Sequence, residues 1–257
     1  MNAYLESLFS LTGRTAIVTG GSSGIGRGIA AALARAGASV VIVARGRDRV
    51  DETVASLTAE GCRVAGVLGD LSTRDGIRAL AEDATVAFGD PDIVVHSAGI
   101  NIRPAYAEIT ENDWDATMTV NALAPFLLGQ RYGTGMVERG YGRIIHISSQ
   151  QAHRAFVSSG VYGVSKGAIE SLVRSEAEAW GGTGVTSNAL VPGFVLTPLN
   201  ARLQQDPQKV SELAERTMIG RNGLPDDFAG AAVFLAGAGS SYVTGQSLFV
   251  DGGLSVH

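Results

Sequence analysis

The sequence predicts a single α/β domain in which helices cover both faces of a doubly wound parallel sheet of about seven strands. Short β-branched runs alternate with helical patterns along the chain. Most runs are apolar throughout, as in parallel strands that are buried on both faces. This alternation implies right-handed crossovers. No Pro/Gly/Ser linker or repeat interrupts residues 1–257, so a single domain is expected.

The strands are expected where β-branched and apolar residues cluster and a polar or glycine residue follows. In chain order the runs are TAIVTG (15–20), SVVIVAR (39–45), RVAGVLGD (63–70), DIVVHSAG (92–99), GRIIHISS (142–149), VTSNALVPG (185–193) and SLFVDGG (247–253). Helical patterns lie between them at 26–37, 75–89 and 166–180. Ligands of such sheets bind beyond the carboxyl ends of the strands, so candidate site residues directly follow the runs.

The first strand leads directly into a glycine-rich turn and an alanine-rich helix. Glycines at 20, 24 and 26 allow a tight turn and a close approach of a diphosphate, which the helix N-terminus attracts. The arrangement predicts a Rossmann-type dinucleotide site, whereas the glycines alone would also fit an ordinary strand-to-helix turn. The expected cofactor contacts are Thr19, Gly20, Ser22, Ser23, Gly24, Ile25 and Gly26.

The ends of the second and third strands bear on the choice of cofactor. An acidic residue usually binds the ribose 2′-hydroxyl of NAD, whereas an arginine accommodates the 2′-phosphate of NADP. Ala44 and Arg45 stand here, which favours NADP over NAD, although Arg45 could be a solvated strand end. Asp70, followed by Leu71, could accept the adenine amino group or cap the next helix.

Tyr162 and Lys166 lie four residues apart in GVYGVSKG. On a helix these positions share one face, so the hydroxyl and the ammonium could address the same small molecule, although such a pair is also common on exposed helices. A tyrosine works as an acid or base near neutral pH only if its pKa falls from about 10 to about 7, which takes roughly 4 kcal/mol. The positive charge of Lys166 is the expected source of that stabilisation.

Several ordered motifs together resemble the short-chain dehydrogenase/reductase family. They are TGGSSGIG (19–26), Asn121 after TMTV, Ser149 in HISS, YGVSK (162–166), PGFVLT (192–197) and VDGG (250–253). The resemblance implies an NAD(P)-dependent enzyme that interconverts a secondary alcohol and a ketone, in a homotetramer. Its implied catalytic residues are Asn121, Ser149, Tyr162 and Lys166.

In this resemblance each residue has an implied role. Lys166 also binds the nicotinamide ribose, Ser149 donates to the substrate oxygen, and Asn121 holds a water that links Lys166 to solvent. Pro192, Gly193, Val195 and Thr197 anchor the nicotinamide carboxamide. The family usually has two asparagines where this chain has His96 and Ser97, while Ala98 and Gly99 keep room for the cofactor. Ser97, Ala98 and Gly99 are therefore further expected cofactor contacts.

The substrate is expected to be polar. A polar helical insertion at 198–222 could form a lid over the site. Polar candidates for the pocket are Arg103, Gln150, Gln151, His153, Arg154 and Arg202. The segments LFSLTGR (8–14), GINIR (99–103) and MVERG (136–140) resemble sugar-acid dehydrogenases of this family. Together with the polar candidates they favour a polyol or sugar acid. A 3-oxoacyl thioester reductase and a non-catalytic NADP-binding protein are the alternatives.

Composition limits the other classes of partner. The net charge of −5 disfavours nucleic acid, whose phosphates need a basic face. The single cysteine, Cys62, forms no internal disulfide, and the four histidines show no metal-ligand spacing. No signal peptide or membrane-length apolar run is recognisable. A cytoplasmic enzyme without a metal or a membrane partner is therefore expected.

Overall fold

The computed structural model describes residues 2–257 and contains one sheet of seven parallel strands. The strands are β1 (Thr15–Thr19), β2 (Ser39–Ala44), β3 (Val64–Leu68), β4 (Ile93–His96), β5 (Gly142–Ile147), β6 (Val185–Pro192) and β7 (Ser247–Val250). Their order across the sheet is β3-β2-β1-β4-β5-β6-β7, so the winding reverses between β1 and β4. All seven predicted strands and the α/β class are confirmed.

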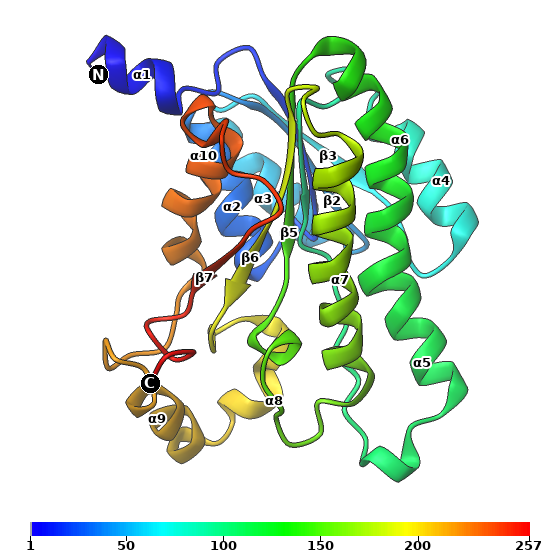
Figure 1. Ribbon diagram of the computed structural model, residues 1–257, viewed down its shortest axis with the longest axis vertical. Helices are drawn as coiled ribbons and strands as arrows, with labels where there is room; N and C mark the ends of the chain where they lie inside the picture. The colour runs from blue at the N-terminus through cyan, green and yellow to red at the C-terminus, as the bar shows by residue number, and fades with distance from the viewer. Residues whose placement is uncertain (1) are drawn as a thin grey trace.

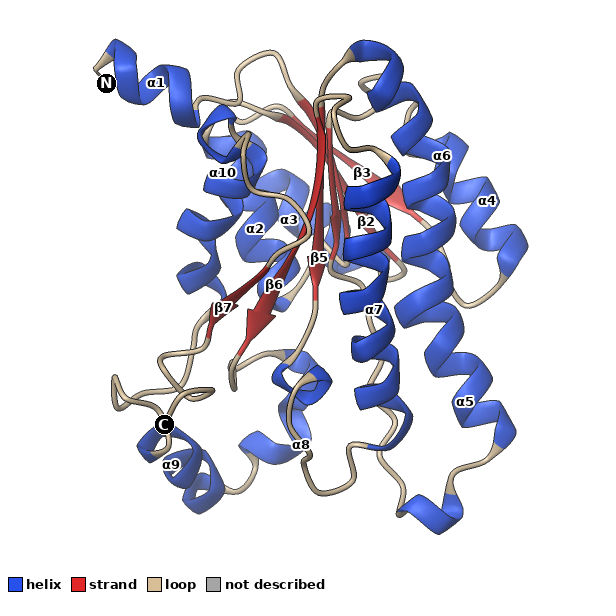
Figure 2. Cartoon of the chain, in the orientation of Figure 1, coloured by secondary structure: helices blue, strands red, loops and turns tan. Residues whose placement is uncertain are grey.

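Helices cover both faces of the sheet (Figures 1 and 2). The helices are α1 (Ala3–Phe9), α2 (Gly24–Arg35), α3 (Arg47–Ala59), α4 (Arg74–Asp83), α5 (Glu111–Met118), α6 (Ala124–Arg139), α7 (Gly160–Ala179), α8 (Ala201–Gln204), α9 (Pro207–Glu215) and α10 (Ala229–Ala236). One core lies between the sheet and α2, α3 and α10, and a second between the sheet and α4 and α6. Within residues 2–257 no helix is long and apolar enough to cross a bilayer.

The predicted boundaries of all three helices differ from the observed ones, and the pattern at 26–37 begins and ends two residues later than α2. The pattern at 166–180 predicts a start at Lys166, but α7 begins at Gly160, because glycines at 160 and 163 hide a helical start that tertiary packing enforces. The earlier start places Tyr162 and Lys166 on one continuous helix. The helix predicted at 75–89 is too long at its C-terminal end, since α4 ends at Asp83 and turns follow.

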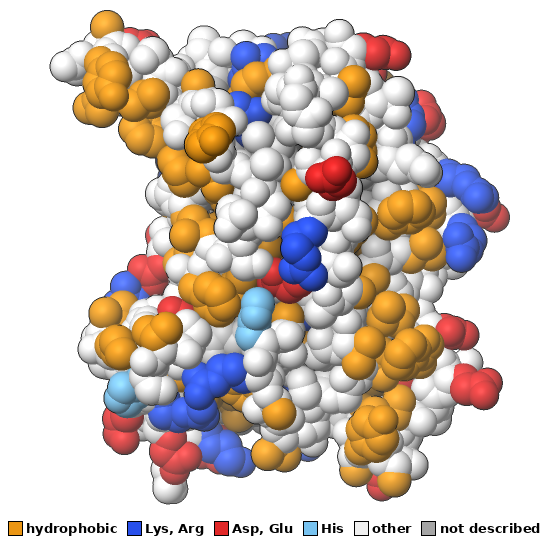
Figure 3. Space-filling model, viewed as in Figure 1, with side chains coloured by type: hydrophobic (Ala, Val, Ile, Leu, Met, Phe, Trp, Pro, Cys, Tyr) orange, Lys and Arg blue, Asp and Glu red, His pale blue; other side chains and the backbone are white. Residues whose placement is uncertain are grey.

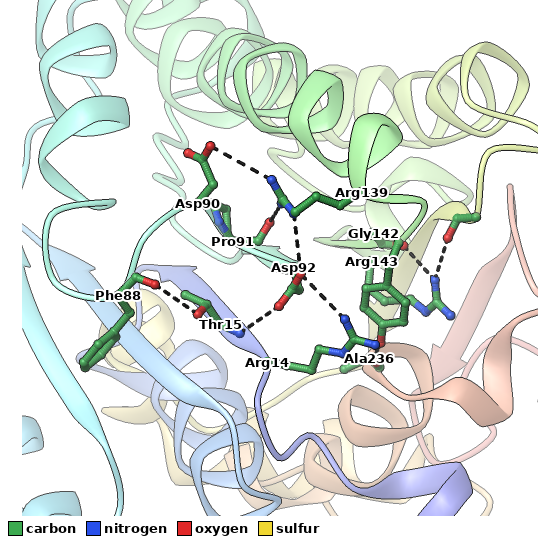
Figure 4. Close-up of polar contacts among 12 residues, drawn as sticks. Arg14, Thr15, Phe88, Asp90, Pro91, Asp92, Arg139, Gly142, Arg143 and Ala236 are labelled. Atoms are coloured by element: carbon green, nitrogen blue, oxygen red, sulfur yellow. Dashed lines mark hydrogen bonds and ion pairs between the residues drawn. The ribbon is translucent and has the colours of Figure 1, made fainter.

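At the amino-terminal edge of the sheet, polar groups join several elements (Figure 4). The Asp92 carboxylate accepts from the backbone N–H of Thr15 at 3.1 Å and lies 3.8 Å from both Arg14 and Arg139. Arg143 is buried and donates to backbone carbonyls of Gly142 and Gly184. These contacts fix the edge opposite the predicted site.

A stacked pair of histidines lies in the middle of the sheet. His96 on β4 and His146 on β5 are in register, and their ring centroids are 4.8 Å apart. The Nε2 atom of His146 is 2.8 Å from the Glu176 carboxylate, which also accepts from Ser187. Neither ring nitrogen of His96 has a hydrogen-bond partner among residues 2–257. Burial, followed by the neighbouring His146, holds the pKa of His96 well below its ordinary value of 6.5.

We expect His96 to make the fold sensitive to mild acid. Below pH 6.5 the histidine binds a proton in the unfolded chain but stays neutral in the folded one. The free energy of unfolding therefore falls as the pH drops, by up to ~1.4 kcal/mol per pH unit. Between about pH 7.5 and 5.5, the unfolding midpoint of the wild type should fall about 2–4 °C more than that of His96→Asn. His257→Asn, at the exposed C-terminus, is the control. An equal fall in His96→Asn and the wild type contradicts the prediction.

Candidate active site

The predicted tyrosine, serine and lysine meet where β5 ends against α7. Tyr162 and Lys166 are both buried on α7, at 7% and 6% exposure. Ser149 lies two residues after the end of β5, and its hydroxyl acts on Tyr162 in the direction that lowers the pKa of the phenol. The Lys166 ammonium lies 5.6 Å from the centroid of the Tyr162 ring. Side chains from α7 and from a strand end thus converge at the carboxyl edge of the sheet.

The balance of effects on the Tyr162 hydroxyl differs from the expectation. Burial raises the pKa of Tyr162 above its ordinary value of 10, and the Ser149 hydrogen bond and then the Arg103 charge act in the lowering direction. The expected positive charge was that of Lys166, but its Nζ atom instead donates to the carbonyl of Ile147 at 2.6 Å. Arg103, from the loop after β4, is therefore the cation that acts most directly on the phenol.

Lys166 is buried, and its burial lowers the pH at which the ammonium loses its proton. Burial lowers the pKa of Lys166 from 10.5 to about 8, and the carboxylate of Glu170 acts in the raising direction. An ideal Cβ at Gly99 would lie 3.9 Å from the ammonium and 3.4 Å from the Asn121 side-chain oxygen. Gly99 therefore leaves open a small space beside these two polar groups.

Asn121 lies on a single π-helical turn, η2 (Thr119–Leu123), between α5 and α6. Such turns are rare and frequently occur at functional sites. The side chain of Asn121 is fully buried; its oxygen accepts from the N–H of Ile100, and its NH₂ donates to the Ile100 carbonyl and to Ser165. It therefore braces the loop after β4 against α7, a role that sequence reasoning did not include.

The glycine turn has the shape that a dinucleotide needs. Gly20 and Gly24 have φ values of +69° and +52°, which favour glycine. A Cβ at Gly26 would overlap the Gly20 carbonyl, and one at Gly20 would lie 2.8 Å from the Ala98 nitrogen. Ser23 precedes α2 without a side-chain cap, so the first N–H groups of this helix stay available for an anion. These residues fit a dinucleotide.

The segment after β6 lies against the same turn. The Thr197 side chain is 3.1 Å from the position of a Cβ on Gly24. Gly193 donates to Val250, and Val195 is buried and bridges to Gly223. Pro192 to Thr197 thus border the cradle. Ser97 is near Gly26, and the Ala98 N–H donates to Thr19 at 3.3 Å, so the predicted residues after β1, β4 and β6 share one crevice.

The rim of the sheet holds Arg45 and Asp70. Arg45 is exposed and has no hydrogen-bond or ion-pair partner within residues 2–257. Asp70 accepts from the N–H and the hydroxyl of Ser72, which lowers the pKa of its carboxyl, and the Arg45 charge adds to the effect. Thr73, and not Asp70, caps α4, so the helix-cap alternative is wrong. Leu71 is buried beneath this rim.

The polar pocket candidates divide into two groups. Arg103 acts on Tyr162, whereas Gln150 donates to Asp251, Gln151 accepts from Ser159, His153 contacts Glu170, and Arg154 donates to Leu254. Gln150, His153 and Arg154 line a separate hollow of about 560 Å³ beside the C-terminal residues. Arg202 is exposed on α8. Five of the six candidates thus have a hydrogen-bond partner within residues 2–257, since Arg103 also donates to Asn101 at 2.9 Å. No acidic and histidine cluster suited to a metal lies within residues 2–257.

Sequence reasoning missed two groups around Lys166. The Ile147 carbonyl fixes its ammonium, and Glu170 lies one helical turn along α7. A backbone carbonyl leaves no mark in the sequence. The spacing of Tyr162, Lys166 and Glu170 at i, i+4 and i+8 was the available signal.

A dinucleotide cradle that opens beside a buried phenol at the switch point of a parallel sheet defines a nicotinamide-dependent oxidoreductase acting on CH–OH groups. A family model described as "Enoyl-(Acyl carrier protein) reductase" matches residues 20–255. The chain belongs to the short-chain dehydrogenase/reductase family.

Relatives of known structure and function align over nearly the whole chain. Gluconate 5-dehydrogenase of Gluconobacter oxydans is 38% identical, over 97% of each chain. A gluconate 5-dehydrogenase from Burkholderia cenocepacia, solved with NADP and tartrate, is 36% identical with a TM-score of 0.92, over 98% of this chain and 99% of that one. A 3-oxoacyl (acyl-carrier-protein) reductase from Agrobacterium tumefaciens with NADP bound is 35% identical with a TM-score of 0.91, over 96% of each.

Proposed function

We propose that the chain is an NADP-dependent dehydrogenase that interconverts a secondary hydroxyl and a ketone in a sugar acid. The observation that carries the proposal is the buried pair of Tyr162 and Lys166 on α7 at the carboxyl edge of the sheet, where the charge of Arg103 also acts on the phenol. A carboxylate-bearing substrate would pair with Arg103 while its carbonyl reaches Tyr162. The similarity to gluconate 5-dehydrogenases supports this substrate class.

In the proposed mechanism Tyr162 is the general acid in reduction. Bound cofactor would supply the hydride. Because burial keeps the proton on the phenol, Tyr162 can donate it to the substrate oxygen as negative charge develops there. Ser149 donates a second hydrogen bond to that oxygen. In oxidation the phenolate takes the proton back.

Lys166 and Asn121 support this centre. Lys166 would hold the nicotinamide ribose next to the space that Gly99 leaves open. Asn121 holds the loop after β4 against α7 through Ile100 and Ser165. We assign the dinucleotide to the glycine turn, to Asp70 and Leu71 at the adenine end, and to Ser97, Ala98 and Gly99. Pro192, Gly193, Val195 and Thr197 are assigned to the carboxamide.

NADP is the proposed cofactor because Arg45 is exposed and unpaired at the rim, while Ala44 offers no carboxylate to the ribose. The NADP named in two of the neighbouring structures supports the same choice. We expect Ala44→Asp to lower kcat/KM for NADPH about 100-fold, because a carboxylate repels the 2′-phosphate. Activity with NADH should persist or rise.

The measurement is a comparison of initial rates with the two cofactors. Arg45→Ala should lower kcat/KM for NADPH about tenfold and leave kcat/KM for NADH nearly unchanged. Arg78→Ala, an exposed arginine on α4, is the control for loss of a surface charge. Equal use of NADH and NADPH by the wild type would overturn this assignment.

A substrate screen separates the proposed function from its alternatives. NADPH oxidation is followed with 5-ketogluconate, with neutral ketoses and with an acetoacetyl thioester. Preference for the ketoacid supports the proposal, and preference for the thioester supports a 3-oxoacyl reductase. A chain that binds NADPH but reduces none of a broad ketone panel would be a non-catalytic binding protein.

Two further features belong to this proposal. The segment 198–222, with α8 and α9, lies at the carboxyl edge below β6 and β7 (Figure 1) and is the proposed substrate lid. Exposed apolar side chains gather over α5 and α6 (Figure 3), including Trp114 and Phe126. They would suit subunit packing in a homotetramer, which light scattering measures. A cytoplasmic location and the absence of a nucleic-acid partner stay predictions from composition.

A further inference from the structure

We propose that Glu170 is a positioning residue whose buried carboxylate keeps the Lys166 ammonium charged inside an apolar site. The inference rests on the proposed function, because it concerns how Lys166 supports Tyr162. Tyr162, Lys166 and Glu170 follow one another at single helical turns along one buried face of α7. All three are less than 8% exposed.

The Glu170 carboxylate is fixed from two other elements. One oxygen is 3.3 Å from Nε2 of His153, just after the short helix η3 (Gln150–Ala152), and the other accepts from the Ser247 hydroxyl on β7. Both partners are compatible with an ionised carboxylate, since each can donate. A negative charge is thereby held one helical turn from a buried ammonium whose one hydrogen-bond partner within residues 2–257 is the Ile147 carbonyl.

The direction of the electrostatic effect follows from this placement. Burial lowers the pKa of Lys166 to about 8, and Glu170 is the charge that raises it. Without the carboxylate, the ammonium would lose its proton at a lower pH. The phenol would also lose its proton at a lower pH, since a nearby negative charge disfavours the phenolate. Both apparent pKa values of the Tyr162–Lys166 pair should therefore fall together.

Few charged side chains other than Glu170 lie near the Tyr162–Lys166 pair. Arg103 faces Tyr162 from the loop after β4, and His153 faces Glu170 from the end of η3. The side chains from η2, β5 and β7 that approach the pair, Asn121, Ser149 and Ser247, are uncharged. Asp251 and Arg154, beside the neighbouring hollow, are bonded to Gln150 and Leu254. Glu170 is thus the one carboxylate poised to act on Lys166 within residues 2–257.

The test is a pH profile of kcat and kcat/KM, in both directions, from about pH 6 to 10. Glu170→Gln keeps the size of the side chain and removes its charge. Its profile should move to lower pH by about one unit, and the pH at which NADPH binding weakens, measured by fluorescence titration, should move with it. Glu170→Asp, which retains a carboxylate farther away, should move less in the same direction.

Two control variants separate charge from structure. Glu178→Gln removes an exposed carboxylate from the same helix and should leave the profile in place. His153→Gln preserves a donor to Glu170 and should leave the alkaline limb in place, because the Glu170 carboxylate remains. Should Glu170→Gln fail to fold, Glu170→Asp against Glu178→Gln carries the same test.

The outcomes are distinct. A folded Glu170→Gln that alters kcat or KM without moving the profile has only a structural role, and that result overturns the inference. An unmoved NADPH titration overturns it as well. If instead Tyr162→Phe keeps full turnover, the proposed function itself fails, which the Glu170 variants alone would not reveal.

Discussion

Replacing Tyr162 with phenylalanine is expected to lower kcat about a thousandfold, within the range that a positioned general acid contributes. The phenyl ring fills the same buried space on α7 but has no proton to give, and it loses the hydrogen bond with Ser149. Cofactor binding should change little, because the glycine turn and Lys166 remain. The measurements are single-turnover rates with saturating NADPH, alongside a fluorescence titration of NADPH binding.

Tyr141→Phe is the matched control for the loss of a tyrosine hydroxyl. The Tyr141 hydroxyl donates to the Ala236 carbonyl at 2.8 Å, and Tyr141 directly precedes the amino-terminal end of β5. This variant should keep its activity near that of the wild type. If Tyr162→Phe turns over within tenfold of the wild type, Tyr162 is not the general acid. If neither the wild type nor Tyr162→Phe reduces any ketone, the result supports the alternative of a non-catalytic binding protein.

Replacing Arg103 with glutamine is expected to lower kcat/KM for a ketoacid about 100-fold, while a neutral ketose of the same length loses little. A substrate carboxylate that loses its hydration on binding needs a charge-assisted hydrogen bond from the protein. Among the pocket candidates, Arg103 is the one whose charge acts on Tyr162. Loss of this charge also raises the pKa of Tyr162. The alkaline limb of ketone reduction should therefore move to higher pH, opposite to the shift expected for Glu170→Gln.

Arg154→Gln is the control, because its guanidinium donates to the Leu254 carbonyl beside the separate hollow. Initial rates give kcat/KM for a ketoacid and for a matched neutral ketose, and the ratio of the two values is compared between the variants and the wild type. Equal losses for the two substrates would show that Arg103 supports the loop, through its hydrogen bond to Asn101, and does not select the carboxylate.

Much of the cofactor crevice was predictable from the sequence. Local geometry requires both Gly26, whose Cβ would overlap the Gly20 carbonyl, and Gly20, which has a positive φ. The order of strands and helices then placed Ser149 and the 192–197 segment at the same edge. Parallel strands point their carboxyl ends one way, so residues that follow them must gather.

Other parts of the site depended on contacts that no local pattern encodes. Asp70 could be read as a helix cap, but it bonds Ser72 and leaves the cap to Thr73. Asn121 lies on a π-helical turn that joins two helices into one continuous path. Gln150 and Arg154, expected in the pocket, are held by Asp251 and Leu254 near the C-terminus.

The sequence by itself determined the parallel sheet, the dinucleotide turn and the identity of the tyrosine, serine and lysine. These features follow from local periodicity, from glycine geometry and from the spacing of residues along a helix. Only the tertiary structure decided which charges surround the phenol and the ammonium. Electrostatic interactions depend on distance through space and on burial, so Arg103 beside Tyr162, and Glu170 held by His153 and Ser247, emerged only once distant segments were packed together.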